Sequence, residues 1–201
     1  MIKKRKLINI RENPIILFNK WFKLAEQNEI NDPNAMNLAT IDKNLKPSSR
    51  IVLLKSYDDK GFIFYTNLES KKGNSIKNNP FVAINFYWKS IRRQIRIEGK
   101  VSIVENLLAE EYFETRPIGS KIGAWASKQS KILKNRDELK KRVNFFEKKF
   151  LNKKISKPLN WSGYRISPNL YEFWQEMPFR LHDRIEFKKN GKKWKGKRLY
   201  P

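Results

Sequence analysis

The chain has no cysteine and only one histidine, His182. Without thiols, disulfides, thiolate catalysis and cysteine metal sites are excluded, and one imidazole cannot build a histidine-rich metal centre within one chain. No apolar run approaches the length needed to cross a bilayer. The basic first residues lead into an apolar run that is broken by Arg11 and Glu12, which does not fit a secretory signal. We therefore expect a cytoplasmic protein with no metal and no membrane partner.

Acidic residues are also scarce. The 201 residues include 44 Lys and Arg but 20 Asp and Glu, so the net charge is +24. Such a charge attracts polyanions, and a non-enzymatic module that binds RNA or DNA is one interpretation. Lysine, asparagine and isoleucine are however frequent in every part of the chain, which indicates a drift in base composition more than a binding patch. We expect no specific nucleic acid partner, and the binding module stays open as an alternative.

The length fits one domain with a real core. Residues 1–13 are predicted to be a mobile basic segment, because the first twelve are polar and basic without periodicity. A single domain is predicted over 14–201. Within it, 14–158 would hold helices and barrel strands, and 159–201 would hold strands that complete the fold.

Helical and strand patterns divide that domain. Apolar positions at helical spacing after Pro14 predict a helix to about Asn28, and the helices expected later cover 105–116 and 134–150. An apolar stripe on the last one, with Leu139, Val143, Phe146 and Phe150, is expected to pack into the core. Strands are expected at 36–41, 49–55, 62–66, 81–88 and 94–104, and after 161, with turns at 167–169 and 189–191.

The strand expected at 94–104 alternates between two faces. Ile95, Ile97, Val101 and Ile103 would face the core, and Gln94, Arg96, Glu98 and Lys100 would face away from it. Antiparallel strands with short turns and one polar face each predict a small barrel or sandwich. The fold class is therefore α+β and mainly β, with the helices at the periphery.

The histidine lies in the segment Arg180-Leu181-His182-Asp183-Arg184. If this segment is extended, Arg180, His182 and Arg184 share one face and Leu181 points away. Two fixed cations and one titratable ring on a single face suit an anionic or electron-rich planar ligand. An exposed basic strand end with a chance histidine is the alternative.

Other side chains that can bind phosphate recur on separate elements. Arg50 and Lys55 flank one strand, Lys71 and Lys72 follow another strand, and Gln129-Ser130 follows an aromatic turn. Tyr112, Arg116 and Ser120 gather around one expected helix end, where Tyr112 and Arg116 are four residues apart and share a face. Together they predict two anion sites.

The same residues carry a resemblance to a known family. Arg50-Ile51-Val52-Leu53-Leu54-Lys55, Phe64-Tyr65-Thr66-Asn67 and Ser70-Lys71-Lys72 resemble the flavin-binding half of pyridoxamine 5′-phosphate oxidase. The match continues in order through Arg116-Pro117, the stretch from Ile122 to Ser130, Glu172-Phe173-Trp174-Gln175, the Arg180 to Arg184 segment and the last residues. It covers the chain from about residue 14 onwards.

The resemblance implies a split β-barrel homodimer with FMN bound at the subunit interface. It assigns FMN contacts to Arg50, Ile51, Val52, Leu53, Leu54, Lys55, Tyr65, Thr66, Lys71, Lys72, Gln94, Gln129, Ser130, Trp174 and Arg184. It assigns substrate contacts to Lys55, Tyr112, Arg116, Ser120, Arg180, Leu181 and His182, among which Arg180 and His182 would serve catalysis.

The implied reaction oxidises pyridoxamine 5′-phosphate or pyridoxine 5′-phosphate to pyridoxal 5′-phosphate in vitamin B6 biosynthesis and salvage. A hydride equivalent would pass from the substrate's C4′ to the flavin N5, and molecular oxygen would reoxidise the flavin and yield hydrogen peroxide. The amine substrate would also release ammonia. A related split-barrel flavoprotein that acts on another small molecule is the enzymatic alternative.

Two positions depart from the family pattern. Lys71 stands where the family commonly has arginine, and lysine keeps the charge but loses the bidentate fork, so we expect a weaker hold on FMN. The lead-in to Arg180, Glu176-Met177-Pro178-Phe179, replaces a segment that usually contains glycine. Pro178 and Phe179 stiffen this loop and affect where Arg180 lies.

Overall fold

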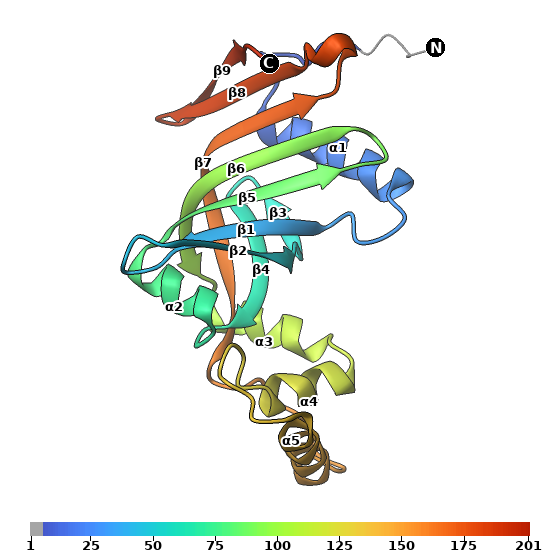
Figure 1. The fold of residues 1–201 in the computed structure, drawn as a ribbon, viewed down its shortest axis with the longest axis vertical. Helices are drawn as coiled ribbons and strands as arrows, with labels where there is room; N and C mark the ends of the chain where they lie inside the picture. Colours follow the sequence, from blue (N-terminus) through green and yellow to red (C-terminus); the bar gives the residue numbers. More distant parts are fainter. Residues whose placement is uncertain (1–5) are drawn as a thin grey trace.

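One curled antiparallel sheet forms the centre of the protein, and the helices lie around it (Figure 1). The structure is a computed structural model that describes residues 6–201. Its helices are α1 (Pro14–Asn28), α2 (Lys71–Asn78), α3 (Asn106–Glu114), α4 (Ile118–Ala126), α5 (Arg136–Lys149) and the 3₁₀ turn η1 (Pro178–Arg180). Its strands are β1 (Ala35–Ile41), β2 (Pro47–Leu53), β3 (Ser56–Asp58), β4 (Gly61–Asn67), β5 (Phe81–Trp88), β6 (Arg93–Ile103), β7 (Trp161–Gln175), β8 (Asp183–Asn190) and β9 (Lys193–Leu199).

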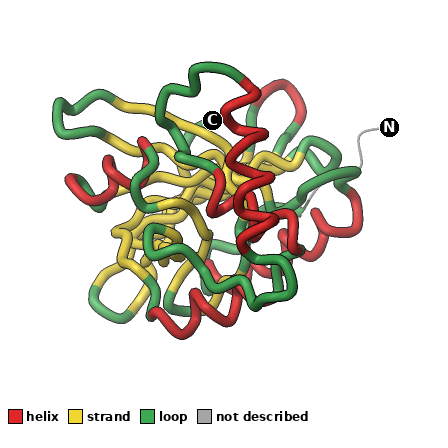
Figure 2. Tube along the Cα trace, turned by 90° about the horizontal axis from the view of Figure 1, so that it is seen from below, coloured by secondary structure: helices red, strands yellow, loops and turns green. Residues whose placement is uncertain are grey.

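The strand order is β2-β1-β5-β6-β7-β4-β3, and β8 and β9 extend the sheet from the other half of β7. β7 is the longest strand. One end pairs with β4 and the other with β8, while β6 runs beside most of its length. It therefore joins the end of the molecule that carries α3, α4 and α5 to the end that carries β8 and β9 (Figure 1). Figure 2 shows the helices around the curled strands. This arrangement confirms the predicted split barrel.

The core lies between this sheet and α1. Asn13 caps the helix, because its side chain accepts a hydrogen bond from the Ile15 backbone N–H, and Pro14 occupies the first turn. Phe18 is fully buried, and its ring makes edge contacts with Phe62 and Phe86 from the sheet. The helix predicted from Pro14 to Asn28 is confirmed to the residue.

Several local predictions are wrong. The turn expected at 167–169 lies inside β7, where a bulge opposite Glu98 and Gly99 takes up the irregularity. Pro168 fits there because a bulge relieves it of a ladder hydrogen bond that its missing N–H cannot donate. A Cβ on Gly99 would lie 2.4 Å from the Ser167 carbonyl oxygen, so the close approach of the two strands requires glycine. Ile103, expected in the core, is 60% exposed beyond the bulge.

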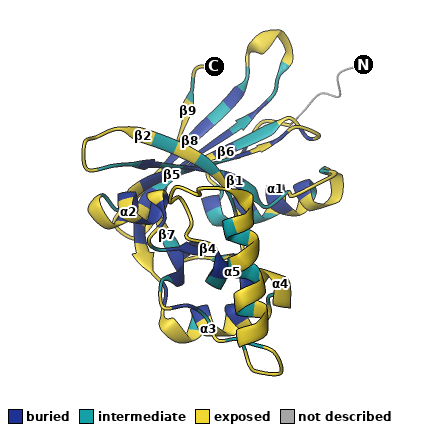
Figure 3. Cartoon of the chain, turned by 60° about the horizontal axis from the view of Figure 1, so that its bottom comes forward, coloured by how far each residue is buried: buried dark blue, intermediate teal, exposed yellow. Residues whose placement is uncertain are grey.

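The stripe on α5 does not reach the core. None of the residues of α5 is buried, and the helix packs instead on α4, where the Trp125 ring lies 5.7 Å from Phe146 and 5.4 Å from Phe150. Figure 3 shows α5 as largely exposed. The sequence predicted neither α4 nor α2. Both are short, and Gly119, Gly123 and Gly73 lower their helical propensity.

The segment from Lys6 to Arg11 lies against β8 and β9. Ile8 is buried, its N–H donates to Asp183 Oδ2 at 2.7 Å, and its carbonyl accepts from Arg198 Nη2 at 3.0 Å. Arg198 also forms an ion pair with Asp183. The first five residues of the predicted mobile segment lie outside the described residues. Among the described residues, no helix is long and apolar enough to cross a membrane.

Candidate active site

A pocket of about 660 Å³ opens where the ends of β2 and β4 meet α3 and α4. Twelve of the residues that line it were singled out from the sequence. They are Arg50, Ile51, Val52, Leu53, Lys55, Tyr65, Thr66, Lys72, Tyr112, Arg116, Ser120 and Gln129. The fold therefore brings together residues from four separate stretches of the chain in one pocket.

One group of cations lies at the end of β4 and the start of α2. Ser70 caps α2 by accepting from the Gly73 N–H at 3.3 Å, and this turn directs Lys72 inward. Lys72 is 8% exposed, and its Nζ donates to Thr66 Oγ1 at 3.1 Å and to Gln129 Oε1 at 3.3 Å. Burial, and then the nearby Arg50, lower the pKa of Lys72.

Arg50 completes this group from β2. Its Nη1 donates to the Leu38 carbonyl at 3.2 Å and to Thr40 Oγ1 at 2.7 Å, and its Nη2 donates to Ser48 Oγ at 2.6 Å. Burial lowers the pKa of Arg50. All of these hydrogen-bond acceptors are neutral, so the two cations of this group are held without a compensating negative charge.

A second group lies between α3 and α4 on a stack of aromatic rings. The Tyr65 ring lies 4.0 Å from Tyr112 and 5.2 Å from Trp161, with interplanar angles of 12° and 6°. The Arg116 guanidinium lies 5.0 Å from the centre of the Trp161 ring, and Lys55 Nζ lies 6.0 Å from the centre of Tyr112. Burial lowers the pKa of Arg116. The stack fixes the position of these cations by contact with ring faces.

The pocket suits anions, and one atom shows this directly. Arg116 Nη1 is buried with no hydrogen-bond partner among the described residues. Within the described part of the chain, no Asp or Glu lines the pocket. A buried donor without an acceptor costs free energy, which a bound phosphate oxygen would offset. The residues present therefore fit a phosphorylated cofactor and a phosphorylated substrate.

Trp161, Thr115 and Pro117 also line the pocket, and none of them was singled out as a site residue. Trp161 was read only as the start of a strand. Its proximity to Tyr65 and Tyr112 depends on the pairing of β7 with β4, where Asn67 lies opposite Trp161. Sequence spacing carries no signal of that pairing.

The remaining predicted site residues lie elsewhere. Leu54 is buried in the core, and Lys71 is exposed at the start of α2. Ser130 is exposed, with a left-handed φ of 69°, beside Gln129. None of these three lines the pocket.

Gln94, Trp174 and Arg184 form a row across β6, β7 and β8, in which Gln94 is paired with Trp174 and Trp174 with Arg184. His182 lies beside this row, with its ring 4.6 Å from Trp174, and its Nδ1 accepts from the Met177 N–H at 3.3 Å. Gln94, Trp174, His182 and Arg184 do not line the pocket.

The prediction that Arg180, His182 and Arg184 share one face required an extended segment from Arg180 to Arg184. The structure shows that this segment is not extended throughout. Pro178–Arg180 form a 3₁₀ turn, and Phe179 and Arg180 have left-handed φ angles of 59° and 62°. β8 begins only at Asp183, so Arg180 is not placed by strand alternation. The physical reason is Pro178, which fixes the turn and cannot continue the ladder. Arg180 and Leu181 are both exposed.

Metal binding has no support in the described residues, among which no group of three or more His, Cys, Asp or Glu side chains could hold an ion. Fold and pocket together define a split-barrel protein with a cationic, aromatic-walled site for phosphorylated ligands.

Comparison with known proteins gives the family. The model described as "Pyridoxamine 5'-phosphate oxidase" matches residues 22–148, and "Pyridoxine 5'-phosphate oxidase C-terminal dimerisation region" matches 161–201. The chain belongs to the pyridoxamine 5′-phosphate oxidase family. It is 50% identical over 192 residues to a pyridoxine/pyridoxamine 5′-phosphate oxidase of Sinorhizobium fredii, covering 94% of this chain and 93% of that one. The corresponding protein of Gluconobacter oxydans is 47% identical, with coverage of 97% and 98%.

Solved structures agree on the fold. PhzG from Burkholderia lata 383, solved in complex with tetrahydrophenazine-1-carboxylic acid, superposes with a TM-score of 0.89 at 30% identity and covers 94% of this chain and 93% of its own. An FMN binding protein from Nostoc punctiforme has a TM-score of 0.74 at 14% identity, with coverage of 94% and 99%. The family model and the curated relatives, and not these structures, show that the chain is an oxidoreductase of this family.

Proposed function

We propose that this protein oxidises pyridoxamine 5′-phosphate or pyridoxine 5′-phosphate to pyridoxal 5′-phosphate with FMN as cofactor. The observation that carries the proposal is the pocket in which two groups of cations have no carboxylate partner among the described residues. Two such groups fit two phosphates, one on the cofactor and one on the substrate. The names of the relatives supply the substrate class.

The first group would hold the FMN phosphate. Lys72 and Arg50 supply positive charge, and the side-chain oxygens of Thr66 and Gln129 hold the Lys72 ammonium by accepting hydrogen bonds from it. Charge-assisted hydrogen bonds of this kind are worth about 1.5–3 kcal/mol each. Ile51, Val52 and Leu53 line the pocket beside this group and would flank the flavin.

The second group would hold the substrate phosphate. Arg116 offers its unpartnered Nη1, and Lys55, Tyr112 and Ser120 lie around the same opening. A phosphate held there is remote from the carbon that reacts, so its binding energy fixes the orientation of the substrate ring. FMN, when bound, would accept the hydride equivalent from C4′. Molecular oxygen would then reoxidise the flavin and be reduced to hydrogen peroxide.

His182 would hold the pyridine ring together with Arg180. Because His182 Nδ1 accepts a hydrogen bond from the Met177 N–H, the neutral ring carries its proton on Nε2. Nε2–H is then the atom that can donate to the substrate. Leu181 would pack beside the same ligand. With the amine substrate, water replaces nitrogen at C4′ and ammonia leaves.

One chain does not gather all of these residues. From β2, which carries Leu53, the sheet runs through β1, β5, β6 and β7 to β8, which carries Arg184. Five strand spacings of about 4.8 Å give about 24 Å along the sheet. We propose that a second chain supplies its Gln94, Trp174, His182 and Arg184 to this pocket, so that the homodimer holds two sites. The match of 161–201 to a dimerisation region supports this arrangement.

The test is an anaerobic titration. The protein is loaded with FMN, pyridoxamine 5′-phosphate is added, and the visible flavin absorbance is followed. We expect bleaching, recovery of the colour in air, and formation of pyridoxal 5′-phosphate, hydrogen peroxide and ammonia. Bound flavin that stays oxidised would move the substrate to another small molecule, of which the PhzG ligand is one to try. A protein that takes up no FMN would contradict the proposal and favour the polyanion-binding alternative.

A cytoplasmic location stays a prediction.

A further inference from the structure

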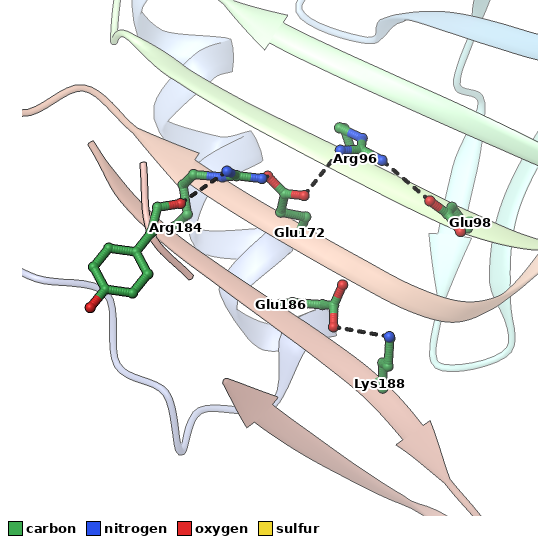
Figure 4. Close-up of polar contacts among 7 residues, drawn as sticks. Arg96, Glu98, Glu172, Arg184, Glu186 and Lys188 are labelled. Carbon is green, nitrogen blue, oxygen red and sulfur yellow. Dashed lines mark hydrogen bonds and ion pairs between the residues drawn. The ribbon is translucent and has the colours of Figure 1, made fainter. Parts of the chain in front are cut away.

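A buried carboxylate lies behind Arg184 in the middle of the polar face of the sheet. Glu172 on β7 is 6% exposed. Its Oε2 accepts from Arg96 Nη1 at 3.0 Å, and its Oε1 accepts from Arg184 Nε at 3.0 Å. Figure 4 shows Glu172 between the two guanidinium groups, one from β6 and one from β8. Glu172 is not among the site residues predicted from the sequence.

The contacts fix the Arg184 guanidinium on two sides. Glu172 Oε1 holds Nε and also Nη2, which lies 2.9 Å away, while Nη1 donates to the Tyr200 carbonyl at 3.0 Å. A guanidinium has five N–H donors, and these contacts use one on each of its three nitrogens. Two donors remain, one on Nη1 and one on Nη2, so the side chain is immobilised but can still bind a ligand.

The pairing of β7 with β8 gives Glu172 an unfavourable neighbour. In the register of β7 and β8 it lies directly opposite Glu186, and like charges in that position destabilise a sheet. Lys188 pairs with Glu186 at 3.3 Å, which leaves Glu172 to the two arginines. The ion pair with Arg96 at 3.0 Å does not involve Arg184, so Glu172 keeps a cationic partner when Arg184 binds a ligand.

We propose that Glu172 is a positioning residue that orients Arg184 for the flavin. The inference rests on the proposed function, in which Arg184 is one of the residues supplied to the pocket that would hold FMN. Glu172 does not touch the ligand itself. It holds the guanidinium at one angle, which spares the entropy of ordering a long side chain when FMN binds. Arg96 balances its charge from the opposite strand.

Glu98 provides a matched control. Its Oε1 accepts from Arg96 Nη2 at 3.3 Å and its side chain is 44% exposed. The Arg184 guanidinium contacts Glu172 and the Tyr200 carbonyl instead. We would measure equilibrium FMN binding to three apoproteins: wild type, Glu172→Gln and Glu98→Gln. Quenching of flavin fluorescence reports the binding. We expect the dissociation constant to rise about tenfold or more in Glu172→Gln, because a charged hydrogen bond is lost. In Glu98→Gln it should stay within about twofold of wild type.

A double-mutant cycle separates positioning from general damage to the fold. Arg184→Ala weakens FMN binding, and adding Glu172→Gln to it should then change the constant by less than about twofold. A similar rise in both backgrounds would show that Glu172 does not act through Arg184, and it would overturn the inference. Should Glu172→Gln not fold, Glu172→Asp keeps the charge but draws it back by one methylene, and it should also weaken binding.

The outcome for wild type distinguishes the two proposals. If wild type takes up no FMN, the proposed function fails, and the inference fails with it. If wild type binds FMN and Glu172→Gln binds it equally well, only the role of Glu172 is refuted. Thermal unfolding of each apoprotein, run beside the titrations, shows that loss of affinity is not loss of structure.

Discussion

Lys72 is a cation that the fold buries before any ligand arrives. It is 8% exposed and its hydrogen-bond partners are neutral, so it destabilises the apoprotein. We expect Lys72→Met to unfold at the same or a higher temperature than wild type as apoprotein, and to lose about tenfold or more in FMN affinity. Differential scanning calorimetry and fluorescence titration measure the two effects.

The same lysine gives a pH dependence. Its folded pKa is lowered from the unfolded value of 10.5, so the folded state binds this proton less tightly. Its cost to stability is full below the folded pKa and disappears as the pH rises towards the unfolded pKa. The advantage of Lys72→Met over wild type should therefore shrink in alkaline buffer. Lys77→Met, an exposed change on the same helix, is the control and should show no such trend.

Arg116 makes the corresponding prediction for the substrate. Its Nη1 has no partner among the described residues, and its guanidinium lies on the Trp161 and Phe113 rings. Arg116→Ala should raise the KM for pyridoxamine 5′-phosphate about 10- to 100-fold through the lost phosphate contact, and leave FMN affinity nearly unchanged. Arg136→Ala, which removes an exposed cation on α5, is the control. An unchanged KM in Arg116→Ala would refute the phosphate assignment.

At the scale of elements, η1 is strained. Phe179 has a left-handed φ of 59° and is 93% exposed, directly before Arg180. A side chain in that region costs about 1–2 kcal/mol, partly offset by the greater freedom of unfolded glycine. We expect Phe179→Gly to raise the free energy of unfolding by about 0.5–1 kcal/mol and to alter substrate KM, because Arg180 follows it directly.

Leu45 is the matched control for that substitution. It has a φ of 62°, is 78% exposed, and lies in the turn between β1 and β2, away from Arg180. Leu45→Gly should bring a similar gain in urea unfolding with no change in KM. If Phe179→Gly is less stable than wild type, the assignment of strain to this turn is wrong.

The sequence predicted elements well where one local rule decided them. Pro14 and the apolar positions at helical spacing up to about Asn28 defined α1, and the strand predicted at 81–88 is β5 to the residue. It failed where a long-range contact overruled the local signal. Pro168 predicts a turn, yet β7 continues past it because the strand stays paired with β6 on both sides of a bulge. The stripe on α5 reads as core, yet the helix packs on the short α4 and none of its residues is buried.

The site divides in the same way. Residue types and spacing identified Lys72, Arg116 and Gln129 as anion-binding groups, and the pocket brings them together. Trp161 and Glu172 were missed because their roles arise from strand register, Trp161 against β4 and Glu172 between Arg96 and Arg184. Register is a property of the paired strands, and residue types and spacing in a single sequence do not predict it.

For the whole molecule, the charge of +24 should act on rates more than on affinity. Anionic ligands are steered to a cationic protein, and salt screens this attraction over about 10 Å at 0.1 M. We expect the association rate constant of FMN to fall as NaCl is raised, while the dissociation rate constant changes little, because the bound phosphate lies beside buried cations. Stopped-flow mixing measures both. Riboflavin, which has no phosphate, is the control ligand, and an equal salt effect on both would contradict steering.

The distance between the pocket and the row of Gln94, Trp174 and Arg184 has a genetic consequence. If each site takes the pocket of one chain and the row of the other, Arg116→Ala and Arg184→Ala damage different halves of it. A dimer with one chain of each kind holds one doubly damaged site and one intact site. Two impaired variants expressed together should then restore activity, up to half of wild type in each mixed dimer. Purification through two different tags isolates the mixed species, and a mixed dimer no more active than its parents would place the whole site within a single chain.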